Sequence, residues 1–242
     1  MNMKETFRYT VTAADTDSRG YMTPRALIQQ LVLAATFRNK EEGGGQGVLR
    51  EKLGAAWMFR RVKLEQLLPL RAGDELVGYG SGRTDCTTEY ILRGVFMRGN
   101  EEAARLDIAM MPVVLKARKK LTCKDIEPFY TTKALNEVAP FERLPIMESM
   151  EYSSEKTITR DDCDANAAHF ASHNYADLVC REIGYFEGDY RMMAQLQIDY
   201  VKECLPGTTI KLGKLAANGG FTVQGIHLNG KPCFNARCEY QT

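Results

Sequence analysis

Reactive side chains concentrate in one stretch of this sequence, Thr157 to Tyr185. Acidic, amide and imidazole residues gather there, including two of the chain's three histidines: Asp161, Asp162, Asp164, Asn166, His169, His173, Asn174 and Asp177. A carboxylate or an imidazole can take a proton from an attacking water, and amide or imidazole N–H groups can stabilise an oxyanion. These residue types therefore favour acid–base chemistry with stabilisation of developing charge.

An apolar pattern follows these polar residues. Tyr175, Leu178, Val179 and Ile183 recur at the spacing of one helix face. We predict a polar loop over residues 160–168 and a buried helix over about residues 169–184. The reactive groups would lie where the loop meets the helix.

The first half of the chain must supply part of the scaffold. Residues 4–12 alternate apolar and polar residues, as a strand does. Pro24 opens a helix that is apolar on most sides and ends before Gly43, and residues 48–52 suggest a short second helix. Apolar and β-branched runs predict four strands, over residues 57–67, 74–83, 88–98 and 103–115.

The second half follows the same plan after a polar connection over residues 116–150. A strand over residues 152–159 precedes the loop and helix, and four more strands are predicted, over residues 192–203, 208–217, 221–229 and 231–240. Thr10-Val11-Thr12 matches Thr157-Ile158-Thr159 at an offset of 147, and Asp15 and Asp17 match Asp162 and Asp164. The offset later falls to 134 and then 131, which indicates tandem copies of one unit with shorter loops in the second.

Each unit is a helix followed by a sheet that can wrap around it. A helix that is apolar on nearly all sides must be covered on most of them. The predicted fold class is therefore α+β: a tandem (double) hotdog, each copy a long central helix wrapped by a curved antiparallel sheet. We place the N-terminal hotdog at residues 1–125, a linker at 126–149 and the C-terminal hotdog at 150–242.

Comparison of the two copies separates scaffold from chemistry. Asp162 and Asp164 recur in the first copy, so they shape the loop at least in part. Asn166, His169 and Glu203 do not recur. At the local offsets their counterparts are Arg19, Met22 and Pro69. A purely structural role would be shared by both copies, and we therefore assign the chemistry to the second.

These residues resemble those of the acyl-acyl carrier protein thioesterases of plants and bacteria. That family carries Asp-x-Asn-x-His-x-Asn-Asn-x-x-Tyr at its second central helix and Arg-Arg-Glu-Cys at the end of a later strand. Asp164-Ala165-Asn166 fits the first motif, His169 and Tyr175 keep its spacing, and Glu203-Cys204 ends the second. This chain differs in having one more residue between Asn166 and His169 and Ala171-Ser172 in place of the paired Asn.

The resemblance implies hydrolysis of acyl-acyl carrier protein thioesters to free fatty acids, without a metal or cofactor. By analogy, Asp164 and Glu203 would handle the attacking water, while Asn166 and His169 would bind and polarise the carbonyl. His173 is a second candidate histidine. Cys204 also permits a Cys–His–Asn nucleophile, which we rank below water because nothing in the sequence marks this thiol as ionised.

The resemblance further places the acyl pocket mainly in the first half. The candidate substrate-binding residues are Met22, Trp57, Phe59, Arg60 and Arg61. A basic stretch could dock an acidic carrier protein by charge complementarity, through Lys116, Arg118, Lys119, Lys120 and Lys124. The same stretch is equally typical of a solvated linker, and Arg60, Arg61 and Lys63 are alternative docking residues.

Bulk properties exclude several other classes. A net charge of +1 over 242 residues gives no reason to expect nucleic acid, and no apolar run is long enough to span a bilayer. We expect a cytoplasmic protein, because the N-terminus lacks the apolar segment of a signal peptide and the seven cysteines fit free thiols. Cysteine and histidine spacing does not match a zinc finger, and the third histidine, His227, is predicted at the surface of a strand.

Three alternative functions stay open at this point. The substrate could be an acyl-CoA, or the chain could be an inactive hotdog that binds acyl thioesters. A hotdog dehydratase would need a histidine and an acid that face each other across the two copies, and the first copy has no such histidine or acid. Two fused copies satisfy the usual hotdog pairing within one chain, so a monomer and a homodimer both fit.

Overall fold

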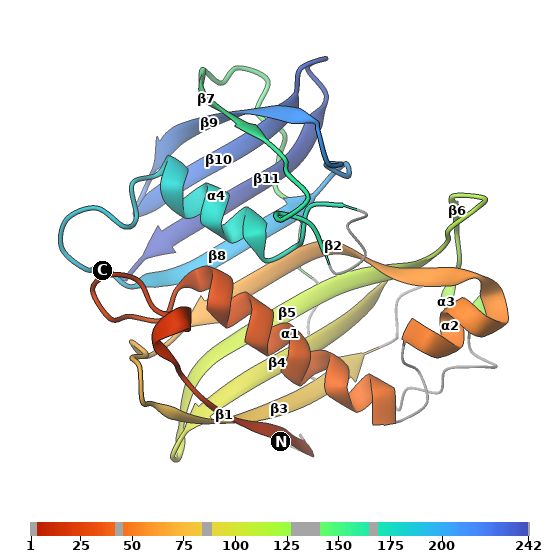
Figure 1. Cartoon of the computed structure of the whole chain (residues 1–242), viewed down its shortest axis with the longest axis horizontal. Helices are drawn as coiled ribbons and strands as arrows, with labels where there is room; N and C mark the ends of the chain where they lie inside the picture. The colour runs from red at the N-terminus through yellow and green to blue at the C-terminus, as the bar shows by residue number, and fades with distance from the viewer. Residues whose placement is uncertain (1–3, 42–45, 84–88, 127–140, 165–168, 242) are drawn as a thin grey trace.

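The computed structural model describes residues 4–41, 46–83, 89–126, 141–164 and 169–241, and its strands form one antiparallel sheet (Figure 1). The strands are β1 (Lys4–Thr10), β2 (Ala55–Gln66), β3 (Glu75–Arg83), β4 (Tyr90–Arg98), β5 (Glu101–Val114), β6 (Lys119–Lys120), β7 (Tyr152–Thr157), β8 (Met193–Tyr200), β9 (Thr209–Ala217), β10 (Gly220–His227) and β11 (Pro232–Tyr240). Their order is β1-β3-β4-β5-β2-β8-β11-β10-β9-β7, with β6 paired to β5. The predicted α+β class, an antiparallel sheet with few helices, is confirmed.

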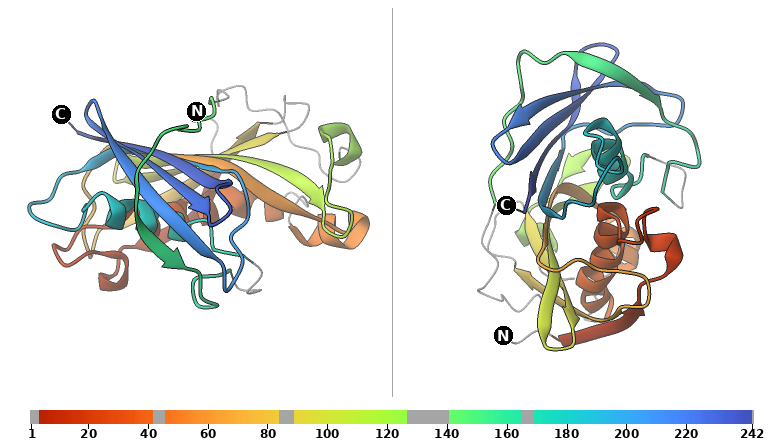
Figure 2. Two further views of the ribbon diagram at one scale, coloured as in Figure 1. Left: turned by 90° about the horizontal axis from the view of Figure 1, so that it is seen from above. Right: turned by 90° about the vertical axis from the view of Figure 1, so that its left-hand side faces the viewer.

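The two long helices lie on one face of this sheet (Figures 1 and 2). The helical elements are the 3-10 helix η1 (Ala13–Asp15) and the α-helices α1 (Pro24–Glu41), α2 (Gln46–Leu53), α3 (Cys123–Ile126) and α4 (Asn174–Glu182). Helix α1 packs on β3, β4 and β5, and α4 contacts both β9 and α1. Buried side chains from both halves form a single apolar cluster.

Helix α1 approaches the sheet closely at Gly94. A Cβ at this position of β4 would clash with the backbone carbonyl oxygen of Leu31. Leu27, Ile28 and Leu31 are fully buried on this side of the helix. A glycine in the strand therefore allows the helix backbone to pack directly on the sheet.

The halves meet along β2 and β8, which pair antiparallel. Lys63 lies opposite Gln197, and these two positions are equivalent at the offset of 134. The flanking pairs are Val62 with Ile198 and Leu64 with Leu196, so each strand presents the same positions to the other. This is the pattern of an approximate two-fold axis, and it leaves neither strand as an open edge.

The helix predicted over residues 169–184 begins later than expected. Helix α4 starts at Asn174, because the backbone N–H groups before it are bonded elsewhere: Phe170 N–H donates to Cys204 O at 2.8 Å, and Ala171 N–H donates to Asp162 O at 3.0 Å. Its end was predicted correctly, since Gly184 has a left-handed φ of 70° just beyond it.

The strand predicted to reach Glu203 ends at Tyr200. The N–H groups of Val201 and Lys202 both donate to Cys233 O, at 2.9 and 3.0 Å, which turns the chain out of the ladder. Glu203 and Cys204 therefore lie in a loop after β8. The sequence pattern did not reveal this turn, because apolar residues continue past the end of the strand to Val201.

The predicted linker, residues 126–149, lies partly outside the described residues, which resume at residue 141. From there the chain is held against the second half. Leu144 N–H donates to Asp199 Oδ2 at 2.8 Å, and Met147 N–H donates to Gln224 Oε1 at 3.0 Å. This end of the connection thus satisfies two buried polar side chains of the sheet.

Among the described helices, none is both long enough and apolar enough to cross a membrane.

Candidate active site

A cavity of about 580 Å³ opens between the two halves, beside the loop that precedes α4. One apolar wall comes from the first half, from β2 and β5 and the residue after β5: Trp57, Met58, Phe59, Met111, Val113 and Leu115. The second half contributes the acidic and imidazole side chains, from the loop before α4 and the loop after β8, together with apolar residues such as Phe170 and Tyr200. An apolar pocket with a few convergent polar groups is the usual form of a ligand site.

Backbone hydrogen bonds bring the two polar loops together. Asp164 N–H donates to His169 O at 3.0 Å, which closes the loop before α4. The bond from Phe170 N–H to Cys204 O then ties that loop to the segment after β8. As a result Asp164, His169 and Glu203, distant in sequence, all line the same cavity.

The same bonds occur in the first copy and correct the sequence alignment. Asp17 N–H donates to Tyr21 O, and Met22 N–H donates to Leu70 O, at 2.9 and 2.8 Å. His169 is therefore the counterpart of Tyr21. The prediction that its counterpart is Met22 is wrong by one position. The second copy has one additional residue between Asp164 and His169, so the offset rises from 147 to 148 there.

At the corresponding place in the first half, the described side chains are engaged in packing and in an ion pair. Tyr21 stacks on Tyr190 with ring centroids 3.6 Å apart, and the carboxylate of Asp17 is paired with Arg19 at 2.6 Å. Aromatic packing and an ion pair thus occupy the positions that His169 and Asp164 hold in the second copy.

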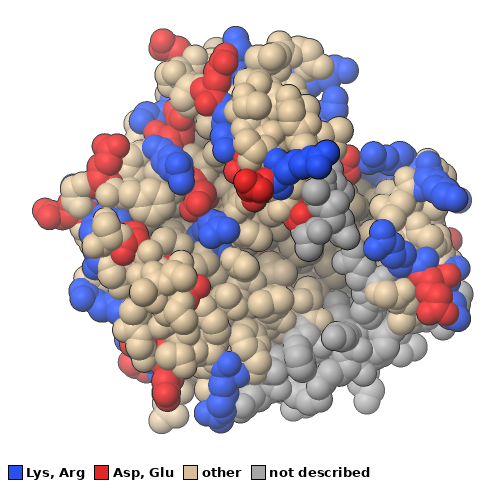
Figure 3. All heavy atoms as spheres, in the orientation of Figure 1, with Lys and Arg blue, Asp and Glu red and all other residues tan. Residues whose placement is uncertain are grey.

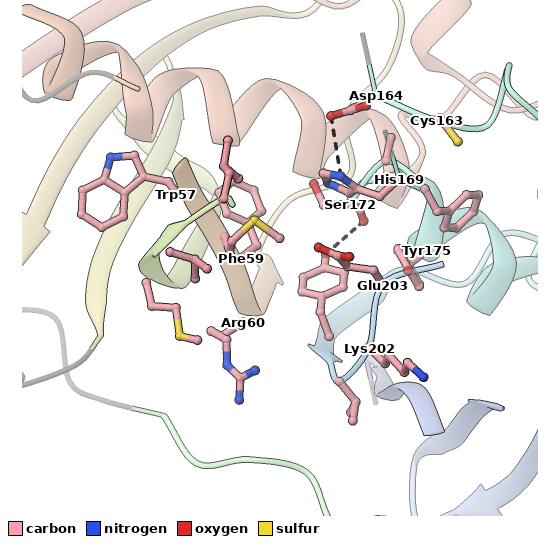
Figure 4. A pocket seen from close by; sticks show the side chains of 18 of the residues that line it. Trp57, Phe59, Arg60, Cys163, Asp164, His169, Ser172, Tyr175, Lys202 and Glu203 are labelled. Carbon is pink, nitrogen blue, oxygen red and sulfur yellow. Dashed lines mark hydrogen bonds and ion pairs between the residues drawn. The ribbon is translucent and has the colours of Figure 1, made fainter. Parts of the chain in front are cut away.

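The reactive groups are arranged around one end of the cavity (Figure 4). His169 Nδ1 lies 3.8 Å from Asp164 Oδ2. Glu203 approaches the same end, and Trp57 lies across the cavity. The Arg118 Nη1 group contacts both carboxylate oxygens of Glu203, at 3.0 and 2.9 Å. An ion pair this exposed contributes little to stability, but it orients the carboxylate.

His173 also lines the cavity, at the cap position before α4. Burial, and then the nearby positive charge of Arg25, lower the pKa of His173 to about 4. Arg25 is itself held against α4, because its Nε donates to Asn174 Oδ1 at 2.7 Å. His173 is therefore a neutral imidazole at neutral pH.

Five catalytic residues were predicted, and the structure places four of them. Asp164, His169 and Glu203 line the cavity, whereas Asn166 lies outside the described residues. Cys204 is fully buried and does not line the cavity. The structure thus gives its thiol no direct access to a substrate in this cavity.

Of the predicted substrate-binding residues, Trp57, Phe59 and Arg60 line the cavity, and Met22 and Arg61 do not. Met22 is buried in the apolar core, and its backbone bridges to Thr16 just before α1. A β-bulge between Phe59 and Arg61 shifts the strand register, and Arg61 pairs with Glu89 instead, at 2.5 Å. Sequence alternation alone does not reveal such a bulge.

The basic stretch lies at the rim of this site. Arg118 and Lys120 line the cavity, and Lys116, Lys119 and Lys124 are exposed nearby. Lys and Arg side chains gather on the side of the molecule where β6 lies (Figure 3). The sequence predicted only a docking role for Arg118, because its partner Glu203 is 85 positions away and no local pattern links the two residues.

Comparisons with known proteins extend the resemblance to the fold. No protein-family model matches the chain, and no curated protein sequence matches it. The fold is similar to that of an acyl-ACP thioesterase from Bacteroides thetaiotaomicron, with a TM-score of 0.84, 14% identity and coverage of 97% of this chain and 96% of the other. A 12:0-ACP thioesterase from Umbellularia californica gives a TM-score of 0.78, also at 14% identity and with the same coverage.

Another similar structure is named for a different reaction. A MaoC-like dehydratase from Phytophthora capsici matches with a TM-score of 0.54 and 14% identity, over 77% of this chain and 72% of its own. The fold is thus shared by proteins named for different reactions, and function must be argued from the site.

Proposed function

We propose that this protein hydrolyses acyl-acyl carrier protein thioesters and releases free fatty acids. One observation carries the proposal: Asp164, His169 and Glu203 line one cavity whose facing wall is apolar. A thioester carbonyl could lie among the polar groups while its acyl chain contacts Trp57 and Phe59. The likeness in fold to acyl-ACP thioesterases supports the same assignment.

The architecture that we propose for this function is the tandem hotdog. The matching hydrogen bonds of the two loops, the equivalent strand orders and the approximate two-fold axis between β2 and β8 support it. In this arrangement α1 and α4 are the central helices, and the linker separates an N-terminal acyl-chain half from a C-terminal catalytic half.

In the proposed reaction a water oxygen forms a bond to the thioester carbonyl carbon, and the carbon–sulfur bond then breaks. Glu203 and Asp164 would accept a proton from the attacking water. That proton would then be transferred to the sulfur of the carrier thiol as it departs. His169, with Asn166, would donate hydrogen bonds to the oxyanion. Arg118 would position Glu203, and Cys204 would take no direct part.

The carrier protein would dock on the basic rim. Arg118 and Lys120 line the cavity mouth, and the exposed lysines beside them extend the positive surface. An acidic carrier domain would be attracted by this surface, and the attraction would weaken as salt is added. A free acyl-CoA offers a smaller contact area, so we propose the carrier-bound substrate.

The experiment is release of fatty acid and free thiol from matched acyl-carrier and acyl-CoA substrates of several chain lengths. We expect Glu203→Gln, His169→Ala and Asn166→Ala each to lower kcat by about 100-fold or more, as losses of acid–base or oxyanion groups do. Glu155→Gln is the matched control, because Glu155 is an exposed carboxylate on β7 away from the cavity.

Each alternative predicts a different result. Full activity in both Glu203→Gln and Asn166→Ala would disprove the site assignment. If Cys204→Ala were the only variant to lose activity, the nucleophile would be the cysteine and not a water molecule. Equal kcat/KM values for the acyl-carrier and acyl-CoA forms would disprove carrier specificity. If the wild-type protein hydrolysed none of the substrates, it would instead be a protein that binds acyl thioesters without hydrolysing them.

A further inference from the structure

Three soft metal ligands meet behind the wall of this cavity. Cys204, His227 and Cys233 each offer one ligand atom, and these atoms lie within 4.8 Å of one another. The three residues are contributed by the loop after β8, the end of β10 and the start of β11. No short sequence motif links them, which is why spacing along the chain did not predict this cluster.

Strand pairing brings the three residues together. The double hydrogen bond from Val201 and Lys202 to the carbonyl of Cys233 holds the Cys204 loop beside β11. His227 N–H donates to Lys231 O at 2.9 Å, which closes the β10–β11 hairpin next to Cys233. The backbone of the cluster is thus fixed by the sheet, so a ligand would find most of the site already formed.

The environment of the donors is that of a ligand site. Cys204 and Cys233 are fully buried. The Nε2 atom of His227 is also buried, although His227 was predicted at the surface, and it has no hydrogen-bond partner among the described residues. A buried polar atom without a partner costs free energy, and coordination to a cation would remove that cost.

The donor set suits zinc in both type and charge. Zinc takes cysteine sulfur at about 2.3 Å and histidine nitrogen at about 2.0 Å, so ligand atoms in a tetrahedral site are about 3.5 to 3.8 Å apart. Small side-chain movements would bring the present cluster to these distances. Two thiolates and one neutral imidazole would balance the charge of Zn²⁺, so the buried complex would carry no net charge.

We propose that Cys204, His227 and Cys233 bind a zinc ion, with water completing a tetrahedral site. The ion would lie behind the active-site cavity, because Cys204 does not line that cavity. It would link the β8 loop to the β10–β11 hairpin. Since Glu203 is adjacent to Cys204, the ion would also stabilise the position of that carboxylate. The inference of a metal site does not depend on the proposed thioester hydrolysis.

The test is binding of Zn²⁺ to the full chain, reduced with a phosphine and freed of metal by chelation. We expect one ion per chain in a competition titration with a chromophoric chelator, and thiolate-to-metal absorption when Co²⁺ is used instead. His227→Gln and Cys233→Ala should weaken binding by more than the roughly 10- to 100-fold loss typical of outer-shell partners. Cys238→Ala, a buried cysteine on the same strand as Cys233, should bind normally.

A second measurement uses the unmodified protein and does not depend on variants that fold. Because Cys204 and Cys233 are buried, alkylation is followed by mass spectrometry in urea just below the unfolding transition, where local opening exposes them. Bound Zn²⁺ should slow alkylation of Cys204 and Cys233 but not that of Cys163. Substoichiometric binding, equal affinity in His227→Gln and wild type, or unchanged alkylation would each overturn the proposal. Hydrolysis assays play no part in these tests, so the outcome is separate from that of the proposed function.

Discussion

At the residue scale, two histidines on the same cavity wall have different surroundings. His169 lies beside the carboxylate of Asp164, whereas His173 is half-buried near the guanidinium of Arg25 on α1. The cation and the loss of water both oppose protonation of His173. Two residues of one type, four positions apart, therefore acquire different electrostatic roles from the elements packed against them.

We predict that His173 does not titrate between pH 5 and 8, because its pKa is lowered to about 4. Unfolded histidine has a pKa near 6.5. The unfolded chain therefore binds a proton that the folded chain does not, and the free energy of unfolding should fall as pH falls from about 6.5 toward 4. Imidazole NMR shifts and urea denaturation at several pH values would measure both effects.

His173→Gln supplies the control for this prediction. The variant should lose the resonance assigned to His173 and the part of the pH dependence of stability that begins near pH 6.5. A His173 resonance with a midpoint near pH 6.5 in the wild-type protein would contradict the expected burial effect.

At the element scale, a shared turn precedes the helix in each half. Thr12 and Thr159 each donate a backbone N–H and a hydroxyl hydrogen bond to the carboxylate three residues on, Asp15 and Asp162 respectively. Lys156 also pairs with Asp162 at 2.9 Å. This turn is common to both halves. The residues to which we assign the chemistry follow it only in the second half.

We predict that Asp162→Ala destabilises the protein by about 1 kcal/mol, as the loss of a capping carboxylate does. Burial alone would raise the pKa of Asp162, but the hydrogen bonds from Thr159 and Lys156 outweigh it and lower the pKa. The stabilisation should therefore be present above the unfolded pKa of about 4 and be lost as pH falls through the folded value.

Urea denaturation of wild type and Asp162→Ala at pH 7 and at pH 3 would test this. The difference in stability should shrink at the lower pH. Asp161→Ala, at the exposed neighbouring position, is the matched control and should stay within about 0.5 kcal/mol of wild type. A pH-independent difference would show that the carboxylate charge does not stabilise the turn.

At the scale of the whole molecule, the two halves share one sheet and one core. Leu64 and Leu196, at most 1% exposed, face each other across the β2–β8 junction. The cavity beside α4 also takes its walls from both halves. The junction therefore fixes the geometry of the site as well as the stability of the sheet.

We predict that Leu196→Ala destabilises both halves together, by about 2 to 5 kcal/mol. The single tryptophan, Trp57, lies in the first half and reports its unfolding, while far-UV circular dichroism reports the whole chain. Both transitions should shift equally in Leu196→Ala, with Leu215→Ala as the exposed control on β9. An unchanged Trp57 transition would show that the halves unfold independently.

The sequence determined most of the elements and indicated that their order repeats. Apolar alternation with a period of two residues located the strands, and Pro24 and Gly184 marked a helix start and a helix end correctly. Local backbone preferences and amphipathic patterns are properties of neighbouring residues, so they can be recognised without the fold. The acidic, amide and imidazole residues around Asp164 and His169 also marked this loop as the candidate site.

Only the tertiary structure decided how distant groups meet. It assigned His169 to the position of Tyr21, removed Arg61 and Met22 from the cavity and placed Arg118 on Glu203. It also gathered Cys204, His227 and Cys233. Such contacts depend on strand register, on the bulge in β2 and on loops that leave the sheet early. A shift of one residue changes which side chains meet, and no local pattern specifies that shift.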